Sequence, residues 1–168
     1  TKLDYFNGLH IRALSDRELA ERLVPFFHAE GIEASVDKLE KLAPILKERL
    51  PTLDEAIPMA AFFFKDKVAF SKDDLVQKGL TGENCREILQ KTFDLMSSHA
   101  TLDKDELEPI LREYGEERNY SAGQVFGTLR VAITGQKVSP PLFESMAVIG
   151  LDVVLKRIQN AIGMLSEG

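Results

Sequence analysis

The segment QVFGTLRVAITGQKVSPPLFE, from Gln124 to Glu144, carries the clearest structural pattern in this chain. Apolar residues at helical spacing around Arg130 predict an amphipathic helix that stops at Thr134-Gly135. A short polar loop then leads to Ser139-Pro140-Pro141, where we expect Ser139 to cap the next helix and Pro140 to occupy its first turn. The pattern therefore places a guanidinium close to the N-terminus of a second helix.

An arginine beside a helix start is suited to bind a flexible anionic polymer. Arginine offers a rigid fork of N–H donors, and the helix start offers unpaired backbone N–H groups with a partial positive charge. Spacing alone equally fits an ordinary solvated or ion-paired Arg130, because many helical arginines do no more than that. The inward stripe of this helix is formed by other residues, namely Val125, Leu129, Ala132 and Ile133. Both interpretations of Arg130 stay open on these grounds.

Helical periodicity continues through the N-terminal part of the chain. A capping box at Ser15–Glu18 opens a helix that Gly31 ends. A second helix is expected to follow Ser35 and to end at Leu50, because the next residue is a proline. Both segments place apolar residues at the spacing of a buried face.

A second capping pattern, Thr52–Glu55, predicts a helix through Phe64 that contains Pro58. The polar run Lys65–Lys67 and a serine cap at Ser71 then mark a boundary. No convincing strand alternation is present, and further helices are expected near 83–98, 104–118, 122–133, 141–149 and 152–165. We therefore predict an all-α fold of two helical-bundle subdomains, residues 1–70 and 71–168.

Charge argues against a protein that clamps long stretches of duplex nucleic acid. The 168 residues carry a net charge of -6, whereas such proteins usually show a basic surface. The local charge has the opposite sign, since the segment Arg118–Lys137 contains three cationic residues and no acidic one. No apolar run approaches the roughly 20 residues that span a bilayer, so no membrane association is expected. The absence of a starting Met suggests a piece of a longer protein.

Catalytic and metal-binding signals are weak. The single cysteine, Cys85, excludes an internal disulfide or a cysteine metal cluster and fits a reducing, cytoplasmic compartment. His10, His28 and His99 lie on separate expected elements without metal-ligand spacing, and phosphate-loop and nucleophile-elbow motifs are absent. The run Phe62–Phe64 could stack on bases, but buried packing is the favoured interpretation. We expect no catalytic group, metal or cofactor in this chain.

Three segments resemble the C-terminal anticodon-binding region of bacterial glutamyl-tRNA synthetases. They are Lys2–Arg12, Lys47–Leu53 and Phe126–Glu144, and the resemblance extends in order over essentially the whole chain. The family usually has Trp where this chain has Tyr5, and Tyr where it has His10. The resemblance implies an α-helical cage that holds the anticodon loop of tRNA(Glu).

The resemblance also implies the site residues. Arg130, Ser139, Pro140 and Leu142 match family positions that contact anticodon bases. Arg49 matches the position at which arginine accompanies acceptance of glutamate tRNA alone, and glutamine accompanies acceptance of glutamine tRNA as well. We expect the guanidinium groups of Arg49 and Arg130 to converge on the anticodon.

The parent enzyme implied by the resemblance is a monomeric glutamate–tRNA ligase whose upstream catalytic domain uses ATP and Mg²⁺. Two alternatives stay open. The atypical lysyl-tRNA synthetase carries a similar helical cage. A helical protein–protein adaptor would also suit the acidic surface and the phenylalanine-rich seam.

Overall fold

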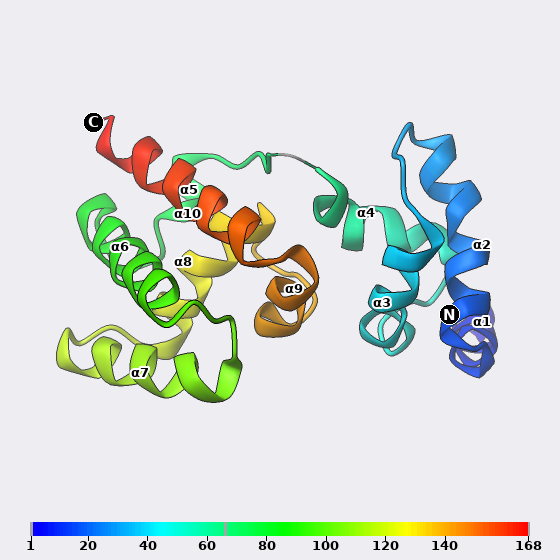
Figure 1. Cartoon of the computed structure of the whole chain (residues 1–168). Helices are drawn as coiled ribbons and strands as arrows, with labels where there is room; N and C mark the ends of the chain where they lie inside the picture. Colours follow the sequence, from blue (N-terminus) through cyan, green and yellow to red (C-terminus); the bar gives the residue numbers. More distant parts are fainter. Residues whose placement is uncertain (1, 66, 168) are drawn as a thin grey trace. The chain divides into compact units, whose positions relative to one another are not determined.

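The computed structural model describes residues 2–65 and 67–167, with side chains from Asn7 onward. Every regular element in this part of the chain is a helix, which confirms the all-α prediction (Figure 1). The chain divides into two compact units, Thr1–Asp66 and Lys67–Gly168. No helix of the described residues is both long and apolar enough to cross a membrane.

Unit 1 is built around two packed helices, α2 (Asp16–Ala29) and α3 (Val36–Lys47), with α1 (Lys2–Ala13) against α3. The expected caps are present. The Ser15 hydroxyl accepts from the Glu18 amide at 3.1 Å, and the Ser35 hydroxyl accepts from the Lys38 amide at 3.2 Å. Fully buried side chains from both helices form the core between them: Leu19, Leu23, Phe27, Leu39, Leu42 and Leu46.

The prediction of one continuous helix over residues 52–64 is wrong. The segment forms a 3₁₀ turn at Leu53–Glu55, a short α4 at Ala56–Ala60 and a second 3₁₀ turn, η2, at Ala61–Phe64. Thr52 makes no side-chain capping bond. Pro58 lacks the N–H that would bond to the carbonyl four residues earlier, which removes one hydrogen bond from a regular α-helix over this segment.

The three phenylalanines that end this segment pack into unit 1. Phe62 and Phe63 are buried, and their rings stack with centroids 4.2 Å apart. The Phe64 ring meets Phe27 of α2 edge-on at 5.2 Å. The packing interpretation of this run is therefore confirmed.

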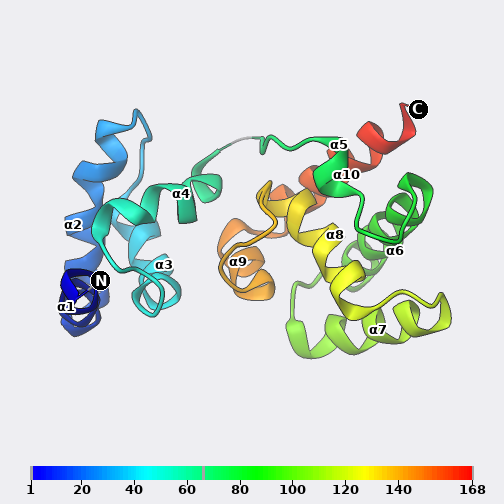
Figure 2. The same cartoon turned by 180° about the vertical axis from the view of Figure 1, so that it is seen from behind.

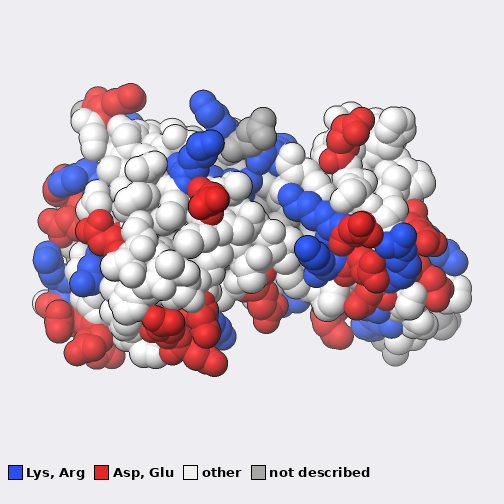
Figure 3. Space-filling model, viewed as in Figure 1, with Lys and Arg blue, Asp and Glu red and all other residues white. Residues whose placement is uncertain are grey.

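In unit 2, α8 (Ala122–Thr134) has its most extensive contacts with four other helices of the unit (Figures 1 and 2). These are α5 (Lys72–Leu75), α6 (Gly82–His99), α7 (Lys104–Glu117) and α10 (Leu151–Ser166), while α9 (Leu142–Ile149) packs on α10. Cys85 of α6 is fully buried beside the hydroxyl of Thr128. In Figure 3, charges of both signs lie mainly around the edges of the visible face of unit 2.

Unit 2 begins at Lys67, before the boundary expected after residue 70. The reason lies at Gly135, the residue that ends α8 in a left-handed conformation with φ +74°. A Cβ atom there would lie 2.9 Å from the Ala69 carbonyl oxygen and 3.2 Å from the Val68 Cβ. The segment that starts at Lys67 thus packs on the end of α8, which the local polarity of the sequence does not reveal.

Candidate nucleic-acid interface

The turn between α8 and α9 is shaped by Thr134 and Gly135. The Gly135 amide donates to the Val131 carbonyl at 2.8 Å, which closes the last turn of α8. The Thr134 hydroxyl donates to the Arg130 carbonyl at 2.6 Å and accepts from the Gln136 amide at 3.1 Å. These bonds reverse the chain within a few residues and bring the following loop back toward Arg130.

Arg130 is half-buried and is held by that loop. Its Nη1 donates to the Ser139 hydroxyl and, at 3.0 Å, to the Pro140 carbonyl. It forms no ion pair with any described carboxylate, so the ion-paired interpretation does not hold within the described chain. Burial lowers the pKa of the guanidinium from its ordinary value, with no carboxylate to offset the desolvation. The structure therefore brings together Arg130, Ser139 and Pro140.

The capping role expected for Ser139 is wrong. Pro141 occupies the N-cap position, its carbonyl accepts from the Ser145 amide at 2.9 Å, and α9 begins at Leu142. Ser139 instead donates its hydroxyl hydrogen to the Pro140 carbonyl at 2.8 Å while it accepts from Arg130. No side chain caps α9, so the amides of its first turn remain available to an acceptor.

A cavity of about 280 Å³ opens beside this helix start. Its lining includes Arg130, Pro141, Leu142, Phe126, Phe143 and Arg112. The two phenylalanine rings meet edge to face with centroids 6.1 Å apart, and the Arg112 guanidinium lies 5.3 Å from the centre of the Phe126 ring. Cationic groups and aromatic rings thus border one recess, together with the carboxylates of Glu108 and Glu144.

The Arg112 side chain is held in place by Glu108, a residue of the same helix, α7. Its Nε and Nη2 donate to one carboxylate oxygen of Glu108, at 3.0 and 2.7 Å. The same guanidinium is the main reason that the pKa of Glu108 lies below its ordinary value. Arg112, Phe126 and Phe143 were not among the predicted site residues. The two phenylalanines fall inside the segment that opened the sequence analysis, whereas nothing local to Arg112 indicates that it faces them.

Arg49 lies in unit 1, just after the C-terminal end of α3. It is exposed, and its Nη1 donates to the Ile45 carbonyl of the last helical turn at 3.1 Å. This bond satisfies one of the helix's terminal carbonyls, as expected for a cation at that end. The remaining N–H groups of the fork form no ion pair with the described carboxylates.

The described residues contain no group of three or more His, Cys, Asp or Glu side chains arranged to hold a metal ion. His99 Nδ1 lies 2.6 Å from a carboxylate oxygen of Glu106, in an exposed pair on the surface of unit 2. His10 and His28 belong to unit 1. The arginines and phenylalanines around the start of α9 are instead typical of a binding surface.

Comparison with known proteins agrees with this geometry. The anticodon binding domain family matches residues 18–162. The chain is 37% identical to a glutamate–tRNA ligase of Dehalococcoides mccartyi over 99% of its own length, and 36% identical to that of Roseiflexus castenholzii over 98%. A crystal structure of a glutamate tRNA ligase from Elizabethkingia meningosepticum in complex with its amino acid covers 96% of the chain with a TM-score of 0.78 at 21% identity.

This chain belongs to the anticodon-binding domain family. It corresponds to the anticodon-binding region of glutamate–tRNA ligases. The chain spans about a third of the length of these relatives, 35% of the Dehalococcoides protein and 34% of the Roseiflexus protein. The solved structure is likewise covered over 32% of its length, and at this identity it supports the fold alone.

Proposed function

We propose that this chain reads the anticodon loop of tRNA(Glu) as part of a glutamate–tRNA ligase. The observation that carries the proposal is the position of Arg130 at the uncapped start of α9, beside a cavity of about 280 Å³. Single-stranded RNA loops are read by unstacked bases that lie on aromatic or guanidinium faces and bond through their edges. The recess offers both kinds of group.

Each residue of this corner has a role in the proposal. Arg130 uses Nη1 to hold the loop and presents its other N–H groups to a base carbonyl or a phosphate. Ser139 and Pro140 orient the Arg130 guanidinium through a hydroxyl and a carbonyl, and Leu142 supplies apolar contact to a base. The free amides at the start of α9 favour an acceptor oxygen.

Arg49 is proposed to discriminate between glutamate and glutamine tRNAs. The last anticodon letter is C for glutamate and G for glutamine. Cytosine presents the acceptors O2 and N3, whereas the Watson–Crick edge of guanine presents mainly N–H donors. A guanidinium has only donors, so guanine would leave desolvated donors facing one another.

The parent ligase is proposed to act as a cytoplasmic monomer, with ATP, Mg²⁺ and glutamate bound by a catalytic domain upstream of this chain. The described helices are then a recognition module. This division of labour accounts for a chain with RNA-binding features and no metal cluster within its described residues.

Titration of the 168-residue chain with anticodon stem-loops tests the proposal. Loops that carry UUC, UUU and a scrambled sequence on one common stem are compared by fluorescence anisotropy at two salt concentrations. We expect salt-sensitive binding with UUC bound most tightly. Preference for UUU would favour the atypical lysyl-tRNA synthetase, and an absence of RNA binding would favour a protein–protein adaptor.

A further inference from the structure

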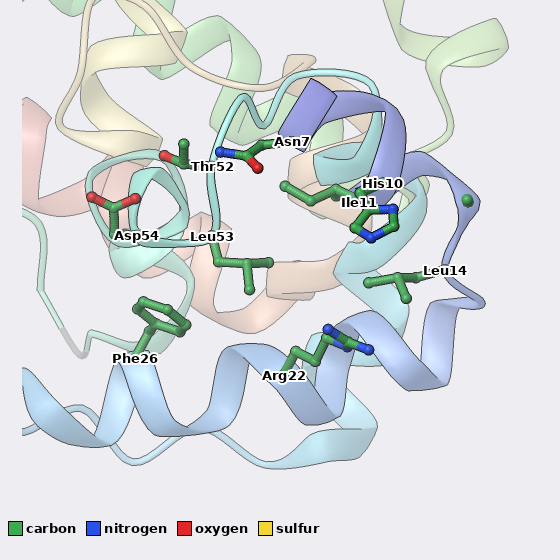
Figure 4. Close-up of a pocket in the computed structure, with 10 residues that line it drawn as sticks. Asn7, His10, Ile11, Leu14, Arg22, Phe26, Thr52, Leu53 and Asp54 are labelled. Atoms are coloured by element: carbon green, nitrogen blue, oxygen red, sulfur yellow. The ribbon is translucent and has the colours of Figure 1, made fainter. Parts of the chain in front are cut away.

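A second cavity, of about 420 Å³, lies within unit 1 between α1, α2 and the turn that follows α3 (Figure 4). Its apolar lining includes Ile11, Leu14, Phe26 and Leu53. Phe26 is 36% exposed, although the next residue of the same helix, Phe27, is fully buried in the core of this unit. The large ring therefore faces an open space rather than protein atoms alone.

Polar groups are separated toward the two ends of this cavity. In Figure 4, Arg22 extends from α2 toward the end where His10 lies, while Phe26 lies toward Asp54 and Thr52. One end thus offers cationic or neutral N–H donors, and the other holds the Phe26 ring, with the exposed Asp54 carboxylate and the Thr52 hydroxyl also on the lining at that end.

Arg22 differs from the neighbouring arginine of the same helix. Arg17 contacts Asp37 at 2.9 Å and Glu40 at 3.2 Å, which joins α2 to α3. Arg22 forms no ion pair with a carboxylate of the described residues, and it is exposed at the cavity. Its full set of donors is available to an anionic ligand.

We propose that this cavity binds a single unstacked purine nucleotide, with guanine preferred. Its phosphate would lie against Arg22 and His10, and its base would stack on Phe26. The Asp54 carboxylate accepts hydrogen bonds but donates none, so it suits the adjacent N1–H and N2–H groups of guanine and not the acceptor N1 of adenine. The volume lies in the range of small-ligand sites.

This inference rests on the proposed function for the source of the nucleotide, an RNA loop or its flank. The cavity itself shares no residue with the recess at Arg130, which belongs to unit 2. The two sites can therefore be tested separately in the same protein.

The experiment is a titration of the ¹⁵N-labelled 168-residue chain with guanosine 5′-monophosphate, followed by amide NMR shifts. Adenosine 5′-monophosphate, guanosine without phosphate and 3-phenylpropionate serve as comparison ligands. We expect saturable shifts around Arg22, Phe26 and Asp54, with the guanine nucleotide bound most tightly. Equal or tighter binding of 3-phenylpropionate would mean a site for apolar anions and would overturn the inference, as would shifts confined to unit 2.

Variants at exposed positions sharpen the test. Phe26→Leu keeps apolar bulk but removes the ring, and Arg22→Gln removes the charge; each should weaken guanosine monophosphate binding about tenfold. Asp54→Asn should bring the affinities for the guanine and adenine nucleotides close together. Arg86→Gln, at a surface arginine of unit 2 paired with Glu83 of its own helix, is the matched control and should leave binding unchanged.

Stem-loop binding measured on the same proteins separates this inference from the proposed function. If the stem-loop binds and depends on Arg130 while no nucleotide enters the unit 1 cavity, only the present inference fails. If the nucleotide binds while every stem-loop fails to bind, the site stands and the anticodon-reading role falls.

Discussion

Replacement of Arg130 by alanine separates a base-reading arginine from a purely structural one. In the free chain the guanidinium makes hydrogen bonds to the Ser139 hydroxyl and the Pro140 carbonyl. At about 0.5–1.5 kcal/mol for each bond, their loss should destabilise unit 2 by about 1–3 kcal/mol. If the remaining N–H groups form a good bidentate contact to a base, binding of the cognate stem-loop should weaken by a further ~1–3 kcal/mol.

The two effects are measured independently. Urea unfolding gives the loss of stability, and fluorescence anisotropy under conditions where the variant is still folded gives the loss of affinity. Arg86→Ala is the matched control, because it removes the same charge from a partly exposed arginine whose ion-pair partner among the described residues is Glu83 of the same helix. We expect that control to bind the cognate loop as the unmodified chain does.

The comparison with a scrambled loop decides the role of Arg130. A base contact predicts that Arg130→Ala weakens the cognate loop and leaves the weak binding of the scrambled loop nearly unchanged. Equal losses for both loops would show that the residue contacts only the RNA backbone. An unchanged affinity for the cognate loop, in a folded variant, would refute the reasoning altogether.

Three further predictions concern other parts of the chain. Arg49→Gln in the parent ligase should relax discrimination against glutamine tRNA, because glutamine can accept as well as donate hydrogen bonds; an unchanged ratio of charging rates for the two tRNAs rejects the assignment. Gly135→Ala should destabilise unit 2 by more than Gly31→Ala destabilises unit 1. Both positions have φ +74°, which costs about 1–2 kcal/mol for alanine. A Cβ atom at Gly135 would also lie 2.9 Å from the Ala69 carbonyl oxygen, whereas a Cβ atom at Gly31 would meet no atom within 4 Å. Hydrogen exchange of α8 and α2 measures the two costs, and equal values would contradict the close approach. Ser121→Ala removes the hydroxyl that accepts from the Gln124 amide, one of the two bonds of a capping box, and should destabilise α8 by about 1 kcal/mol in the same measurement, whereas protection of α8 at its original level would argue against the cap.

Most helices of this chain are predictable because their signals are local. The caps at Ser15 and Ser35 lie next to the amides they bind, and apolar spacing alone indicates which faces are buried. The start and end of α8 follow from Ser121 and Gly135 for the same reason. Local chemistry thus predicts the elements and their class.

The failures have other origins. A cap pattern at Thr52 predicts a helix, but Pro58 removes a hydrogen bond that the pattern does not include. The sequence predicts Ser139 as a helix cap, but its hydroxyl instead accepts a hydrogen bond from Arg130, nine positions earlier. Arg112 reaches the ring of Phe126 across two helices. The last two depend on contacts between separated residues, which the spacing of the sequence does not encode.

The convergence of Arg49 and Arg130 on one anticodon stays a prediction, and the chain offers a direct way to measure it. Its lone thiol, Cys85, is completely enclosed by the interior of unit 2. Two cysteines introduced on the exterior, one in each unit, would therefore be the preferred positions for fluorescent dyes, with little background from the native thiol. Energy transfer between the dyes would then report whether the units draw together when a stem-loop is added.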